Sequence, residues 1–264
     1  MGEQFISGRL PVLALRGLAV FPEQTVHFDI GRAKSALALE YAMKHDQTLF
    51  LVPQKDILDD DPDLAGLYSI GTVVKVKQIL KAQNENIRVL VTGLRRARIL
   101  DLTQNEPHLA GMVETVIETP IKDTLQSRAL CREAAMLYGA YSEMVERPAQ
   151  TVQLRILASE DCGFVADAIA QNSGIDYRDK AKLLCQLNPV RRMESTLKLL
   201  QQEMQMLRIE ADIQEKTRAS IDQDQRDYYL REQMKTIRAE LGEGEDDNEL
   251  AEYEKNILLL NLPQ

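Results

Sequence analysis

The sequence predicts an α+β protein, in which a twisted β-sheet domain with one helix precedes a small helical bundle and one very long α-helix. Three observations support this fold class. Most of the β-branched runs and most of the glycines fall before residue 118. Helical patterns separated by prolines fill residues 119–187. From Val190 to Leu241 the chain contains neither glycine nor proline, which favours a single uninterrupted helix.

The first domain, residues 1–118, is expected to hold the sheet. Residues 10–15 form an apolar strand with Pro11 near its start, where a missing N–H is tolerated. Residues 24–30 alternate polar and apolar, as a half-buried strand does. A helix is expected over residues 32–44 and a turn over residues 82–86. Further strands, giving a sheet of roughly six, are expected over residues 48–52, 70–80, 87–91, 93–102 and 109–118.

Residues 119–187 are expected to form the helical bundle. Asp123 is predicted to cap a helix that runs to Arg147, where Pro148 ends it. Shorter helices are expected over residues 150–158 and 160–171. Asp176 is predicted to cap a last helix that runs to Leu187.

Residues 188–242 are predicted to form a helical arm about 80 Å long, at 1.5 Å per residue. Asn188 can cap it and Pro189 suits its first turn. Its first part carries apolar residues at alternating steps of three and four, typical of a coiled-coil seam. These predicted arm-packing residues are Val190, Met193, Leu197, Leu200, Met204 and Leu207.

Beyond that seam, residues 214–227 are almost wholly polar, and an apolar stripe restarts at Leu230. We therefore expect an arm that is packed near both ends and solvated in the middle. Residues 243–264 are expected to be a linker and a further helix.

The overall composition limits the classes of function. The chain has 264 residues and a formal net charge of −9, a poor match for phosphate backbones, so we do not expect it to bind nucleic acid. No apolar run is long enough for a membrane span, and the start lacks the pattern of a signal peptide. Three scattered cysteines fit a reducing cytoplasm.

Motifs of known catalytic chemistry are missing from the sequence. No Gly-Lys pair occurs, which excludes a phosphate-binding P-loop, and GxSxG, HExxH and GxGxxG patterns are also absent. His27, His45 and His108 lie far apart along the chain. We therefore predict no catalytic, cofactor-binding or metal-binding residue. The one basic cluster, residues 95–98, is expected to be a solvated strand edge.

Several short motifs, in this order and at this spacing, resemble the substrate-binding domain of the Lon proteases. They are LPVLALRGLAVFP at 10–22, GRAKS at 31–35, LVPQK at 51–55, LYSIGTV at 67–73 and VTGLRRARI at 91–99. The segment DYYLREQMKTIRAELG at 227–242 is similar to the one that precedes the ATPase in bacterial members.

The resemblance implies a PUA-like fold for the first domain. It also implies a full-length protein that is a cytosolic ring, usually a hexamer, with an AAA+ ATPase that uses ATP and Mg²⁺ and a Ser-Lys peptidase. Neither the Walker motifs nor the catalytic pair has a counterpart here, so this chain is expected to be non-catalytic. By itself it is expected to be a monomer or weak dimer.

The role implied is recognition of unfolded, damaged or degron-bearing proteins, together with organisation of the oligomer. The alternatives are a separate adaptor that binds a ligand or degron, and a PUA-like nucleic-acid binder.

Candidate client contacts are apolar side chains expected at the surface. On the arm they are Met206, Tyr228, Tyr229 and Met234, because flexible thioethers and aromatic rings suit adaptable apolar contacts. In the loop after the first strand they are Phe21 and Pro22, and folding of Phe21 back onto the core is the favoured alternative.

Overall fold

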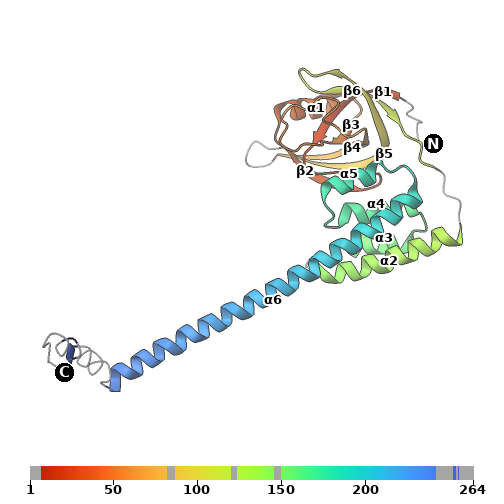
Figure 1. The fold of residues 1–264 in the computed structure, drawn as a ribbon. Helices are drawn as coiled ribbons and strands as arrows, with labels where there is room; N and C mark the ends of the chain where they lie inside the picture. Colours follow the sequence, from red (N-terminus) through yellow and green to blue (C-terminus); the bar gives the residue numbers. More distant parts are fainter. Residues whose placement is uncertain are drawn as a thin grey trace, which may run out of the picture. The chain divides into compact units, whose positions relative to one another are not determined.

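A computed structural model describes residues 7–81, 87–119, 124–145 and 150–241, together with residues 252, 253 and 255. The chain divides into two compact units, Met1–Gln205 and Met206–Gln264. The boundaries predicted at residues 118 and 187 therefore fall inside the first unit. Within the described ranges, the elements are the strands and helices of an α+β protein, as predicted (Figure 1).

The strands of the first unit form one sheet that closes on itself. They are β1 (Ser7–Leu15), β2 (Thr25–Ile30), β3 (Thr48–Pro53), β4 (Ile70–Lys81), β5 (Ile87–Gln104) and β6 (Ala110–Thr115). Their order is β2-β5-β4-β3-β1-β6, and β5 also pairs with β6, which makes a barrel. All pairings are antiparallel except that of β1 with β3.

The long strand β5 corrects one prediction. Residues 87–91 and 93–102 were expected as separate strands, but they form one strand that is bulged where it pairs with β4 and β6. Gly93 does not break it. A Cβ atom at Gly93 would lie 2.2 Å from the carbonyl oxygen of Phe21. Glycine is required because the loop that follows β1 passes close to β5 at this position. The last strand ends at Thr115 rather than 118, and the predicted turn at 82–86 lies outside the described residues.

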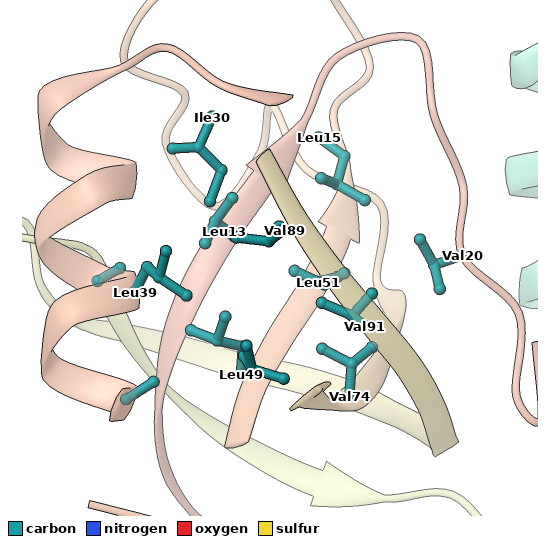
Figure 2. Packing of buried hydrophobic residues seen from close by; sticks show 13 residues of the cluster. Leu13, Leu15, Val20, Ile30, Leu39, Leu49, Leu51, Val74, Val89 and Val91 are labelled. Atoms are coloured by element: carbon teal, nitrogen blue, oxygen red, sulfur yellow. The ribbon is translucent and has the colours of Figure 1, made fainter. Parts of the chain in front are cut away.

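Helix α1 (Ala33–Lys44) covers one side of the barrel. It inserts Ala38, Leu39 and Ala42 among residues from β1, β3, β4 and β5 (Figure 2). Leu39 and Leu49 are completely buried there, each contributing roughly 1.5–3 kcal/mol through removal from water. This core fixes the barrel and the loop that follows β1, since Val20 belongs to the same cluster.

The helical bundle comprises α2 (Leu125–Met144), α3 (Gln150–Ala158), α4 (Cys162–Asn172) and α5 (Tyr177–Cys185). The cap of α2 is Thr124, which forms a reciprocal capping box with Ser127, while the predicted cap lies outside the described residues. Asp161 caps α4, and Asp176 caps α5 as predicted.

Helix α6 (Pro189–Leu241) is continuous, as its sequence predicts. Asn188 Oδ1 accepts a hydrogen bond from the backbone N–H of Arg191, which is the expected cap geometry. Its first turns belong to the first unit. Across the described part of the chain, no helix has the length and apolarity needed to cross a bilayer.

Candidate functional site

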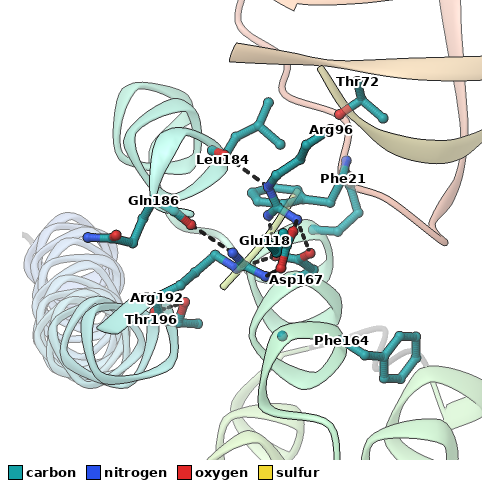
Figure 3. A network of polar contacts seen from close by, with 12 residues as sticks. Phe21, Thr72, Arg96, Glu118, Phe164, Asp167, Leu184, Gln186, Arg192 and Thr196 are labelled. Atoms are coloured by element: carbon teal, nitrogen blue, oxygen red, sulfur yellow. Dashed lines mark hydrogen bonds and ion pairs between the residues drawn. The ribbon is translucent and has the colours of Figure 1, made fainter. Parts of the chain in front are cut away.

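A buried network of ion pairs joins the barrel, the bundle and the start of α6 (Figure 3). Arg96 of β5 makes a bidentate contact with Asp167 of α4: Nη2 donates to Oδ1 at 2.7 Å and Nη1 donates to Oδ2 at 2.8 Å. Arg96 also donates to Glu118, which follows β6, and its Nε donates to the carbonyl of Leu184 at 3.0 Å. One guanidinium group thereby holds three separate segments.

Arg192 of α6 completes the network. Its Nη2 donates to Glu118 Oε2 at 2.9 Å, and its Nη1 donates to the carbonyl of Gln186 at 2.7 Å. Its Nε lies 2.9 Å from Asp167 Oδ1, an ion-pair distance at an angle that does not make a hydrogen bond. Two cations and two anions are therefore balanced at the point where α6 begins.

Each charge in the network depends on its partners, because burial has removed most of the water that would otherwise solvate it. The side chains of Arg96 and Arg192 are each 1% exposed and that of Asp167 is 4% exposed. Burial raises the pKa of Asp167 above its ordinary value, and the two guanidinium groups oppose that shift. Burial lowers the pKa of Arg96, but Asp167 and Glu118 outweigh it and leave that pKa raised. Such an arrangement fixes neighbouring elements and is not set up for proton transfer.

The basic cluster at residues 95–98 was expected to be a solvated strand edge, and this is wrong for Arg96. Strand β5 pairs on both sides, and α4 and α5 cover it at this point. Arg98 is exposed and Arg95 is half-buried. Local sequence patterns do not predict the pairing, because Asp167 lies 71 residues further along the chain.

The loop after β1 is part of the same junction. Phe21 is completely buried among Ala19, Ile70 and residues of α4 and α5, and the Arg96 guanidinium carbon lies 5.9 Å from its ring centroid. Of the two alternatives left open for Phe21, the structure therefore supports folding back onto the core and not an exposed client contact, because the bundle covers the loop. Pro22 is half-buried and lines a cavity of about 200 Å³ beside the network.

The predicted arm-packing residues are largely buried. Met193, Leu197, Leu200 and Met204 are at most 6% exposed. Val190 and Leu207 are half-buried. The four buried residues lie within the first unit, so in a single chain their heptad spacing serves packing within that unit.

The remaining candidates lie in the second unit and are exposed. Met206 and Met234 are each 55% exposed, Tyr228 is 69% exposed and Tyr229 is 62% exposed. Gln233 donates to the hydroxyl of Tyr229 at 3.0 Å across one helical turn.

Sequence reasoning missed that both methionines share one helical face. Steps of three and four from Met206 lead as far as Ile237 and place further exposed apolar residues in the same register. Polar residues occupy the middle of the register. We call its exposed apolar members the arm face: Met206, Ile209, Ile213, Leu230, Met234 and Ile237. The spacing is visible in the sequence, but it is interrupted by polar residues and differs in register from the buried seam that ends at Leu207.

No group of three metal-ligating side chains occurs within the residues that the structure describes.

Comparison with known proteins agrees with this fold. Residues 9–202 match the family of the ATP-dependent protease La (LON) substrate-binding domain. The chain is 36% identical over 261 residues to the Lon protease of Brevibacillus choshinensis, covering 97% of this chain and 33% of that protein. It is 34% identical over 237 residues to the Lon protease of Escherichia coli K12, covering 90% of this chain and 30% of that protein. The chain thus spans about a third of the length of the curated relatives it matches.

A solved structure shares the fold. The N-terminal domain of the Mycobacterium avium complex Lon protease superposes with a TM-score of 0.60 at 22% identity, covering 74% of this chain and 98% of that one. Since the family match extends over most of the sequence, the chain belongs to the Lon substrate-binding domain family.

Proposed function

We propose that this chain is a non-catalytic substrate-recognition module of a cytoplasmic ATP-dependent protease, and that its arm face contacts unfolded segments of client proteins. The observation that carries the proposal is a row of apolar side chains left exposed on a helix in a substrate-binding family. Hydrolysis of ATP, with Mg²⁺, and of peptide bonds is assigned to other parts of such a protease.

The chemistry of the arm face suits clients without a common sequence. Its members are Met, Ile and Leu, which gain free energy by burial against any apolar group and impose few directional demands. Each contact is weak. In a ring of several chains, the arms would act together through a high effective concentration, which multiplies the affinity. Tyr228 and Tyr229 are exposed on the same helix, outside the register of the arm face, and can add contacts with a polar end.

The test is a binding titration with the whole chain. The probe is one small disulfide-bonded protein, offered native and in a reduced, carboxymethylated form that stays unfolded without denaturant. We expect selective binding to the unfolded form that persists at high salt, because apolar contacts are not screened. Replacing all six arm-face residues by serine should weaken this binding at least about tenfold, which corresponds to ~1.4 kcal/mol.

The matched control changes the opposite side of the same helix. Ala211→Ser, Gln214→Ser and Gln225→Ser fall outside the arm-face register and should leave binding unchanged. Equal weakening by both sets would show that the helix, and not the face, matters. Unaltered binding by the arm-face variant would refute the role of the arm.

The role in organising the oligomer rests on the same helix. Heptad spacing on a solvated face also fits pairing between arms of different chains. Sedimentation of the arm-face variant separates the two roles: loss of association with retained client binding would assign the face to assembly. A nucleic-acid binder would instead give a salt-sensitive gel shift, which the charge of −9 does not favour.

A further inference from the structure

Helix α2 presents a second exposed apolar surface, far in sequence from the arm. Its inner side is buried through Ala134, Tyr138 and Tyr141. Its outer side carries Leu125, which is 87% exposed, and Met136, which is 77% exposed. Side chains of this size are costly to leave in water, at about 25 cal/mol per Å².

The outer side is one continuous stripe. Ala129 and Ala140 are exposed between and beyond the two large residues, and Arg132 with Glu133 lies at the centre. Together with Leu125 and Met136 these residues line a single surface hollow along α2. Their spacing of three and four residues keeps them on one face of the helix.

The stripe is complementary to itself. Its midpoint falls between Arg132 and Glu133, and the remaining members are placed symmetrically about that point. In an antiparallel copy, Leu125 would therefore lie opposite Ala140, and Ala129 opposite Met136. Each large side chain meets a small one. A two-fold axis makes each of these contacts twice, as an isologous interface requires.

The charges obey the same symmetry. In the antiparallel arrangement Arg132 of each copy lies opposite Glu133 of the other, giving two ion pairs across the axis. A surface that binds a client peptide does not need a cation and an anion placed symmetrically about its centre. The pattern instead fits a second copy of the same helix.

We propose that α2 is a self-association surface that pairs antiparallel with α2 of a second copy of this chain. The stripe is short, roughly 22 Å for its fifteen steps of 1.5 Å. A single helix pair of this length buries less than the ~800 Å² per partner of a stable interface. The dimer is therefore weak by itself and adds to other contacts in a larger assembly. This proposal does not rest on the arm face.

The experiment is sedimentation velocity of the full chain from micromolar to near-millimolar concentration. We expect a monomer–dimer equilibrium. Arg132→Glu should abolish it, because an introduced glutamate would face Glu133 of the other copy, and Glu133→Arg should abolish it in the same way. Mixing these two variants should restore a dimer, which contains one copy of each, because every facing pair is then opposite in sign.

A control variant tests whether the charge change alone affects association, and a second variant tests the apolar contact. Arg208→Glu makes the same charge change on α6 and should leave the dimer intact. Met136→Lys should abolish the dimer without unfolding the chain, since that side chain is exposed; circular dichroism checks the fold. A chain that is monomeric throughout would overturn the proposal. So would a dimer that survives both single charge variants but is lost in the arm-face variant.

Discussion

Removing Asp167 should destabilise the first unit more than any surface charge does. Asp167→Ala deletes a carboxylate that accepts two hydrogen bonds from Arg96 and lies 2.9 Å from Arg192 Nε. Two guanidinium groups, each 1% exposed, would then share Glu118 alone. Breaking a buried pair by removing one partner costs about 3–5 kcal/mol.

The expected shift follows from the size of the unit. For a unit of this length each kcal/mol moves the melting temperature by roughly 2–4 °C, so the midpoint should fall by roughly 6–20 °C. The assay is thermal unfolding followed by circular dichroism. Asp29→Ala is the control, because its partner Arg88 is exposed and the pair is open to water. A fall in Asp167→Ala no larger than in the control would refute the reasoning.

A triple variant separates the charge from the packing. Arg96→Met, Asp167→Leu and Arg192→Met together remove the three buried charges. Glu118 then has no charged partner in the network, but it can turn towards solvent because its side chain is already 31% exposed. The triple variant should be more stable than Asp167→Ala alone.

Three further results are expected. Gly93→Ala should lose about 1–3 kcal/mol of stability because the new Cβ would meet the carbonyl oxygen of Phe21, whereas Gly139→Ala, inside a helix with its nearest neighbour at 3.5 Å, should gain about 1 kcal/mol; urea unfolding measures both. Burial, and then the nearby Arg9, lowers the pKa of His108, so the unfolded chain binds the proton more readily than the folded chain. The contribution of His108 to stability is therefore full above the ordinary pKa of about 6.5 and is lost as the pH falls through the lower folded value. In unfolding curves measured between pH 8 and 5, His108→Gln should flatten this decline. Burial, then the neighbouring thiol, raises the pKa of Cys131 to about 12, so iodoacetamide should label this residue at pH 8 only after unfolding, as peptide mass spectrometry would show.

The sequence predicts features that depend on neighbouring residues. The caps at Asp176 and Asn188 were correct because a cap requires only a side-chain oxygen within three residues of the first free N–H groups. The continuity of α6 followed from a long stretch without helix breakers.

Features that depend on distant segments of the chain could not be predicted from neighbouring residues. Residues 87–91 and 93–102 were expected as separate strands, since the loop that passes over Gly93 and requires glycine there lies some seventy positions earlier in the chain. Phe21 was a candidate contact because the sequence does not reveal that α4 and α5 cover it. The pairing of Arg96 with Asp167 also depends on tertiary structure, and this pairing allows the arginine to be buried.

The order of the strands has a consequence for synthesis on the ribosome. Strand β1 pairs with β6, and Ser7 lies opposite Glu114. The first strand to leave the exit tunnel must therefore wait for nearly the last residues of the barrel before both of its edges are paired. Until then β1 exposes unpaired N–H and C=O groups along one edge, which can join strands of other nascent chains. The chain thus passes through an aggregation-prone stage before the barrel closes, and slow translation across residues 87–115 would prolong it.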